Sequence, residues 1–166
     1  MSRAKRAVGE RDPVLARNRK ATHEYSILET FEAGIELQGT EVKALRAGRT
    51  QLREGYVRIE DGQAWLLQVH ISPYEQGNRS NHEPERRRRL LMHRREIDYL
   101  DGRVRQQGLT LIPLRLYLRG NRIKLEIGVA RGKKLWDKRH GIAARDARRD
   151  VERITARVAR EASSPS

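Results

Sequence analysis

The sequence contains no cysteine, and aromatic side chains make up only 5% of its 166 residues. The absence of cysteine excludes disulfide bonds, a thiol nucleophile and any metal site that needs thiolate ligands. No apolar run approaches the length of about 20 residues that a membrane-spanning helix requires. Residues 1–6 lack the apolar centre of a secretory signal. We therefore expect a cytoplasmic protein with no membrane partner, no metal site and no cofactor.

The chain instead has an excess of cations. It carries 36 Lys and Arg residues against 22 Asp and Glu residues, which gives a formal net charge of +14. Such a surplus indicates the kind of partner rather than the fold. Binding to nucleic acid is the leading explanation of this excess of cations. Binding to an anionic membrane surface comes second, and a basic tail that serves only solubility comes third. The length and the apolar fraction of 37% predict one modest domain with tails.

Three regions follow from the composition along the chain. Residues 1–20 contain seven Lys or Arg and two acidic residues, which predicts a basic, flexible N-terminal arm. Residues 21–131 carry most of the apolar pattern and form the predicted domain. Residues 132–166 form a basic tail. Within that tail the apolar residues Val151, Ile154 and Val158 make only a thin helical stripe, so we expect it to be disordered alone and helical on a partner.

Alternating apolar residues predict strands within the domain. Asp61-Gly62 is a strong turn signal between alternating segments at 57–60 and 65–69. Two further strands, at 110–118 and 123–129, face each other across a turn, with Pro113 at an edge or bulge. These segments indicate an antiparallel barrel or sandwich, and the pattern alone does not choose between them.

The remaining segments are less regular. Residues 23–37 read as extended segments bent around Glu32-Ala33-Gly34, and Thr40 is a suitable N-cap for a short helix at 41–47. Pro84 can begin a helix, and apolar residues at helical spacing favour one that ends at Gly108. The polar segment at 72–83 between them is typical of a functional or mobile loop.

Support for catalysis is weak. The five histidines show no metal-ligand spacing, and the chain has no phosphate-binding glycine-rich loop. Glu29, Glu32, Glu36 and Glu41 could be imagined as a nuclease metal site. Surface carboxylates that pair with the many cations are the simpler interpretation, so we expect a protein that is not an enzyme.

Support for nucleic-acid binding is stronger. The run Arg86–Arg89, with Arg94 and Arg95, would place dense charge on the predicted mid-chain helix. Trp136 lies between Lys134 and Lys138, which favours an exposed ring on which a base could stack. For Tyr25, burial in the core and stacking on a base are equally good interpretations.

Several short motifs resemble the SmpB family (small protein B, or SsrA-binding protein) of bacteria, in one unbroken order over about residues 15–150. These motifs are Asn18-Arg19-Lys20-Ala21, His23-Glu24-Tyr25, Glu32-Ala33-Gly34-Ile35, Gly39-Thr40-Glu41-Val42-Lys43, Leu45-Arg46-Ala47-Gly48, Arg88-Arg89-Leu90-Leu91, Glu96-Ile97, Lys133-Lys134 and Asp137-Lys138-Arg139. The resemblance implies a mainly β fold with flanking helices, in which an antiparallel β-barrel is related to the oligonucleotide-binding (OB) fold.

The resemblance also implies a function. Such proteins are adaptors that bind the tRNA-like domain of transfer-messenger RNA (tmRNA). They deliver it to stalled ribosomes for trans-translation, the rescue reaction that tags incomplete peptides. The tail then occupies the small-subunit decoding centre and the empty mRNA channel, and we expect a monomer away from the ribosome. A general basic OB-like RNA-binding or ribosome-assembly protein is the alternative.

The resemblance assigns residues to two roles. The RNA-binding residues are Asn18, Arg19, Lys20, His23, Tyr25, Glu32, Lys43, Arg46, Arg88, Arg89, Leu90 and Leu91. The ribosome-engaging residues are Gly132, Lys133, Lys134, Trp136, Asp137, Lys138 and Arg139. Many relatives carry histidine or tyrosine where this chain has Trp136, so stacking rather than imidazole protonation is the expected role there. Glu32 is expected to position a base or an arginine, and no physical reason for an acid at Asp137 emerges.

Overall fold

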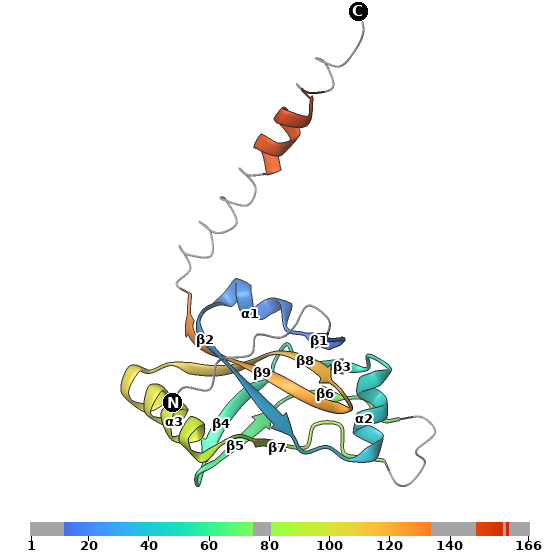
Figure 1. The fold of residues 1–166 in the computed structure, drawn as a ribbon, viewed down its shortest axis with the longest axis vertical. Coiled ribbons are helices and arrows are strands. Elements are labelled where there is room, and N and C mark those ends of the chain that lie inside the picture. Colours follow the sequence, from blue (N-terminus) through green and yellow to red (C-terminus); the bar gives the residue numbers. More distant parts are fainter. Residues whose placement is uncertain (1–11, 75–80, 134–148, 158, 160–166) are drawn as a thin grey trace, which may run out of the picture. The chain divides into compact units, whose positions relative to one another are not determined.

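Six strands form a closed antiparallel ring in the computed structural model, which describes residues 12–74, 81–133, 149–157 and 159 (Figure 1). The ring order is β8–β4–β5–β7–β2–β9, and the pairing of β8 with β9 closes it. This ring confirms the predicted antiparallel barrel and resembles the barrel of the OB fold. The elements are β1 (Val14–Arg17), α1 (Arg19–Glu24), β2 (Tyr25–Ile35), α2 (Gly39–Arg46), β3 (Thr50–Gln51), β4 (Tyr56–Glu60), β5 (Gln63–Leu67), β6 (His70–Ile71), β7 (Arg88–Leu91), α3 (Arg94–Gln107), β8 (Thr110–Arg119) and β9 (Arg122–Gly132).

The two predicted hairpins are confirmed. Asp61 and Gly62 both have positive φ, 50° and 71°, as a two-residue turn between β4 and β5 requires. The β8–β9 hairpin turns at Gly120, and the register of β8 shifts between Pro113 and Arg115, which confirms the predicted bulge. β8 is long enough to share one edge between two partners, since β1 pairs near Leu116 and β4 pairs at Leu111.

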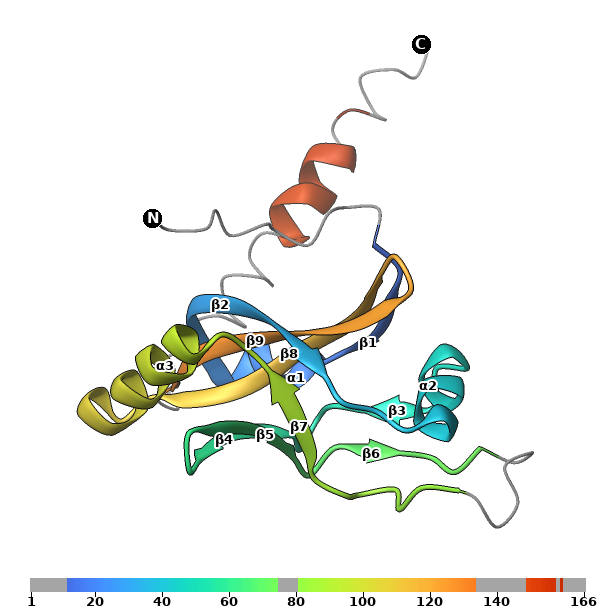
Figure 2. The same cartoon turned by 60° about the horizontal axis from the view of Figure 1, so that its bottom comes forward.

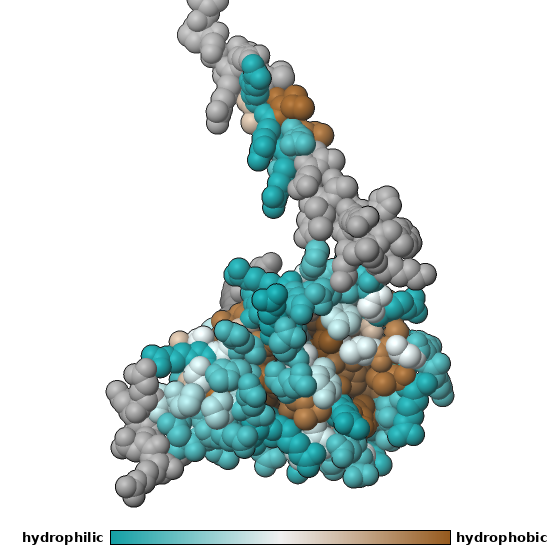
Figure 3. Space-filling view, turned by 180° about the vertical axis from the view of Figure 1, so that it is seen from behind, coloured by the Kyte–Doolittle hydropathy of each residue, from teal (hydrophilic) through white to brown (hydrophobic). Residues whose placement is uncertain are grey.

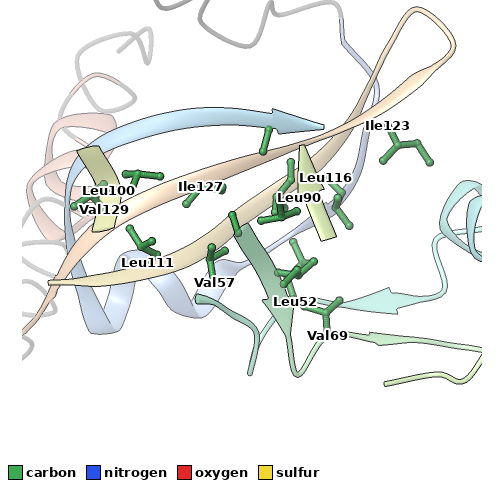
Figure 4. Packing of buried hydrophobic residues seen from close by; sticks show 14 of the residues in the cluster. Leu52, Val57, Val69, Leu90, Leu100, Leu111, Leu116, Ile123, Ile127 and Val129 are labelled. Carbon is green, nitrogen blue, oxygen red and sulfur yellow. The ribbon is translucent and has the colours of Figure 1, made fainter. Parts of the chain in front are cut away.

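Inward-facing residues of these strands fill the barrel (Figure 4). The labelled members of this core are Leu52, Val57, Val69, Leu90, Leu100, Leu111, Leu116, Ile123, Ile127 and Val129. Full burial of each such side chain stabilises the fold by about 1.5–3 kcal/mol. The helices α3 and α2 lie at opposite ends of the barrel in Figures 1 and 2. Leu100 and Ile97 anchor α3 in the core, and Gly108, with φ of 62°, ends that helix as predicted.

The predicted helix from Pro84 is wrong in its first half. Residues 88–91 form β7, and α3 begins only at Arg94. Leu90 belongs to the inward face of β7, so its seven-residue spacing from Ile97 of α3 was coincidental. The burial of residues 88–91 alternates with a period of two, but a buried arginine occupies one inward position. Because arginine is not apolar, the spacing of apolar residues did not reveal the strand at this position.

Three local predictions also need correction. β2 runs through residues 32–34 without a turn, and its register shifts instead between Ile27 and Glu29. The cap of α2 is Gln38, whose backbone N–H donates to Glu41 at 2.9 Å, so Thr40 lies inside the helix. Order starts earlier than residue 21, because β1 precedes that residue and α1 begins at Arg19.

The chain divides into two units, Met1–Gly132 and Lys133–Ser166. In the second unit residues 149–157 are helical, where the sequence predicted a tail disordered without its partner. Val151 and Ile154 are 63% and 64% exposed, and Figure 3 shows apolar side chains gathered on one side of this helix. Among the described ranges, no helix combines the length and the apolar character needed to cross a membrane.

Candidate nucleic-acid interface

Asn18 fixes helix α1 to the barrel. Its side-chain oxygen accepts from the Ala21 N–H at 3.2 Å, and its amide nitrogen donates to the Pro113 carbonyl at 2.9 Å. Its own backbone N–H donates to the Leu114 carbonyl at 2.8 Å. Only an amide combines the capping acceptor with these donors. Asn18 is 8% exposed, so this predicted RNA-binding residue acts as an anchor for its neighbours.

Helix α1 lies on the outer surface of β8 and β9. Ala21 packs against Ile112 and Ala130 in a small cluster that is separate from the barrel core. The exposed side of α1 presents Arg19 and the half-buried Lys20 and His23, which the sequence had placed in the RNA-binding set. A shallow groove beside the helix is lined by Arg17, Asn18, Arg19, Thr22, Ile27, Leu114, Arg115 and Glu126.

Lys20 is not fully available for phosphate. Its ammonium group lies 3.6 Å from Glu24 and 3.3 Å from Glu54. Both pairs are partly exposed, so each contributes about 0–1 kcal/mol to stability and yields readily to a stronger anion. Tyr25 packs against the cluster under α1 while remaining half-buried, so its burial is partly confirmed and a stacking role stays a prediction.

A network of charged side chains continues from α1 across the outer face of β2, β9 and β8. Glu32 of β2 accepts a hydrogen bond from Tyr117 and forms an ion pair with Arg119, both from β8. Arg119 also reaches Asp12 at 3.2 Å. Arg115 contacts Glu126 at 2.8 Å on the adjacent pair of strands. The carboxylate of Glu32 therefore holds an arginine in place, which is the kind of role predicted for it.

Two groups of this network, Tyr117 and Arg119, have raised pKa values. Burial, and then the hydrogen bond to Glu32, raise the pKa of Tyr117, so its hydroxyl remains a donor at neutral pH. Burial lowers the pKa of Arg119, but its hydrogen bond to Asp12 and the nearby Glu32 outweigh burial and raise that pKa overall. The negative charge of Glu32 is thus balanced locally, which lowers its repulsion of a polyanion.

The half-buried Arg115 and Arg119, together with the exposed Arg19 of α1, suit contacts to the phosphates of RNA, because neighbouring carboxylates hold the two β8 guanidinium groups in place. This network does not form a metal centre. Across the part of the chain that the structure describes, no group of three His, Asp or Glu residues could hold a metal ion. Three of the four carboxylates considered as a nuclease site have separate partners, since Glu29 binds Tyr99, Glu32 binds Arg119 and Glu41 binds Arg88.

Arg88 and Leu90 need correction as RNA-binding residues. Arg88 is 0% exposed, and its guanidinium donates to Glu41, to the Val69 carbonyl at 2.8 Å and to the Pro84 carbonyl at 3.0 Å. Leu90 is 1% exposed in the core. Burial raises the pKa of Glu41, but hydrogen bonds from Arg86 and then from Gln38 and Arg88 outweigh it and leave the pKa below its ordinary value.

The other two members of that motif face outward. Arg89 is exposed, and Leu91 is 49% exposed beside Gly34. Lys43 and Arg46 are exposed on α2, which lies apart from α1 in both ribbon views, and Lys43 lies 5.3 Å from the Tyr74 ring centre. The described structure therefore does not gather all predicted RNA-binding residues on one face.

The ribosome-engaging set is mostly outside the described residues. Lys134, Trp136, Asp137, Lys138 and Arg139 all fall there. Gly132, which the resemblance placed in this set, is the last residue of β9 and pairs with Tyr25. Its φ is not in the left-handed region, so the backbone there does not need glycine.

Sequence reasoning missed the β8 and β9 members of the interface, namely Arg115, Arg119 and Glu126, and the buried Tyr117 that supports them. A usable signal existed, because these residues alternate with the apolar residues of two predicted strands and so had to face away from the core. Hydrophilic side chains cover much of the first unit in Figure 3, which suits a charged partner.

Comparisons with known proteins identify relatives of this chain. The sequence profile described as SmpB protein matches residues 15–157. A protein named SsrA-binding protein from Roseiflexus sp. (strain RS-1) is 65% identical over 141 residues, or 84% of this chain and 89% of that protein. One of the same name from Carboxydothermus hydrogenoformans is 58% identical over 142 residues, or 86% and 95%. A solved structure described as "tmRNA-SmpB: a journey to the center of the bacterial ribosome" is similar with a TM-score of 0.63 and 49% identity, over 74% of this chain and 86% of that one.

Proposed function

This chain belongs to the SmpB family, and from that premise we propose that it is an RNA-binding adaptor for tmRNA. It binds the tRNA-like domain of that RNA and delivers it to stalled ribosomes for trans-translation in the cytoplasm. Its contribution is binding and positioning rather than catalysis. The names of its relatives and of the similar solved structure support both partners.

The observation that carries this proposal is the continuous polar surface formed by α1 and the outer face of β2, β9 and β8. Asn18 fixes the helix, and Glu32 fixes Tyr117 and Arg119. Preorganised donors bind RNA with less loss of side-chain entropy than mobile ones. A rigid patch of this kind suits a folded, tRNA-like RNA whose backbone has a fixed shape.

We assign the second role to residues 132–166, which engage the decoding centre and the empty mRNA channel. The helix at 149–157 supports this assignment, because it carries cations and an exposed apolar pair on a segment outside the barrel unit. Trp136 supplies a stacking surface in this role. Trp136→Ala is expected to reduce peptide tagging in a reconstituted translation system while leaving tmRNA affinity nearly unchanged.

The deciding experiment compares two proteins, the full chain and one that ends at Lys133, so that β9 stays complete. Both are expected to bind a tRNA-like RNA with acceptor and elbow more tightly than unrelated hairpins in a gel-shift assay at moderate salt. Only the full chain is expected to support tagging on a ribosome stalled without a stop codon. Equal affinity for every RNA would instead favour a general basic RNA-binding protein.

A further inference from the structure

The outer face of β4, β5 and β7 carries a row of three residues, of which the family resemblance gave a role only to Arg89. Arg58 of β4 lies directly opposite Trp65 of β5, and Trp65 lies directly opposite Arg89 of β7. Directly opposed residues in antiparallel strands have their Cβ atoms about 4.5–5.5 Å apart. The row therefore places one tryptophan between two arginines on a single surface.

A third arginine completes this surface. The guanidinium of Arg87 lies over the Trp65 ring, 4.1 Å from its centre, and it also approaches Glu60 at 3.7 Å. We call Arg58, Trp65, Arg87 and Arg89 the Trp65 surface. Its formal charge is +3, and Glu60 is the one carboxylate that an ion pair brings to it among the described residues.

The two flanking arginines are available to a ligand. Arg58 and Arg89 are exposed, and within the described ranges neither forms an ion pair. This contrasts with Arg86 and Arg88 of the same run, which Glu41 binds. One guanidinium, that of Arg87, covers the ring, and two further exposed arginines flank Trp65 in the register of the neighbouring strands. This arrangement favours a ligand that offers both negative charge and a flat apolar face.

The Trp65 surface lies on the wall of the barrel opposite to α1. In the closed ring, β5 is three strands away from β9 in either direction. Helix α1 covers β8 and β9 through Ala21. In Figure 1, α1 lies above the β8–β9 pair, and β4 and β5 lie below it. A ligand on the Trp65 surface would therefore not occupy the interface described above.

We propose that the Trp65 surface is a second RNA-binding site and that it takes an unpaired strand. Arg58 and Arg89 contact phosphates of that strand, and a base stacks on the layered pair of Arg87 and Trp65. Unpaired bases stack on aromatic rings and on guanidinium planes, while the bases of a duplex are already stacked on one another. This inference goes beyond the proposed function, because the tRNA-like RNA is assigned to the opposite wall.

The test measures binding of a fluorescein-labelled oligouridylate 12-mer to the full chain by anisotropy. Trp65→Leu is expected to weaken binding about tenfold, and Trp65→Phe is expected to restore most of it. The double variant Arg58→Gln/Arg89→Gln should lower the slope of log K against log salt by about 1.4. Arg122→Gln, at an exposed arginine of the β8–β9 hairpin, controls for the loss of charge.

Photo-crosslinking locates the site independently of affinity. An oligouridylate that contains 4-thiouridine is expected to crosslink to the tryptic peptide of residues 59–79, which contains Trp65 and no other tryptophan. Crosslinks confined to other peptides, or equal salt slopes for the double variant and Arg122→Gln, would overturn the proposal. The affinity of the unmodified chain for the tRNA-like RNA is measured in parallel. If the unmodified chain does not bind that RNA, the result counts against the proposed function alone and not against the Trp65 surface.

Discussion

Arg88 and Arg89 have different roles because β7 turns consecutive side chains to opposite faces. Arg88 points inward, where Glu41 and two carbonyl groups satisfy its guanidinium. Arg87 and Arg89 point outward and remain exposed. Residue type alone could not separate them, since the separation depends on Glu41 arriving from α2, far away in the sequence. For this reason all four arginines received the same predicted role in nucleic-acid binding.

The buried Glu41 pair predicts a specific dependence of stability on pH. Since the folded-state pKa of Glu41 lies below its ordinary value of 4.5, its contribution is complete above pH 4.5 and is lost as pH falls through the folded pKa. Glu41→Gln leaves Arg88 without its carboxylate and should cost about 3–5 kcal/mol at pH 7. Denaturant unfolding of both proteins should show this difference shrinking in acid. If the difference in the free energy of unfolding between the two proteins did not change with pH, the lowered pKa of Glu41 would be contradicted.

Asn18 and Arg19 are predicted to separate positioning from contact. Asn18→Ala removes an amide that the Pro113 carbonyl and the Ala21 N–H both need, so unfolding should be easier by about 1–3 kcal/mol. Its affinity for the tRNA-like RNA should fall as α1 loosens. Arg19→Gln should weaken the same binding and lower the salt slope, with stability changed by no more than about 0.5 kcal/mol. Equal stability of the two variants would refute the anchoring role.

At the scale of elements, the hairpins were predictable and the segment before α3 was not. Asp61-Gly62 specifies its turn locally, and β8 and β9 alternate cleanly, so no distant residue was needed. Residues 88–91 are strand only because β5 and β2 lie on either side of them. The extended path of β2 through Gly34 likewise depends on β7 approaching it. Tertiary pairing decided both cases, and the local sequence carries little trace of it.

Two glycines in different elements should respond to alanine in opposite ways. At Gly34 an added Cβ would lie 3.1 Å from the Cβ of Leu91, so Gly34→Ala should destabilise the barrel by about 1–3 kcal/mol. At Gly102, inside α3, an added Cβ meets no atom of the described residues within 4 Å. Gly102→Ala should therefore stabilise the protein by about 0.5–1 kcal/mol. The midpoints of denaturant unfolding of both variants, compared with that of the unmodified chain at an unchanged m-value, measure these changes in stability.

At the scale of the whole molecule, composition indicated the class of partner but not where it binds. The formal charge of +14 pointed to nucleic acid. Placing α1 on one wall of the barrel and Trp65 on the other required the ring order of the strands. Arg115 and Arg119 join the α1 wall only because β8 and β9 pair there.

Two opposed walls predict that the chain can hold two RNAs at once. The affinity for labelled oligouridylate at moderate salt should be nearly the same with and without saturating tRNA-like RNA. The physical reason is that the walls are separated by the barrel, and salt screens the residual repulsion between the two RNAs over about 10 Å. Titrating the oligonucleotide against the preformed complex measures this. Direct displacement of one RNA by the other would show a single shared site.

The closed ring also determines when this chain can fold during its own synthesis. β2 pairs with β9 along most of its length, and Tyr25 pairs with Gly132 at the end of the first unit. A growing chain therefore carries β2 with one edge unpaired until almost the whole barrel has been translated. Unpaired strand edges favour aggregation of partly made chains. The nascent protein consequently depends on protection of that edge until β9 emerges.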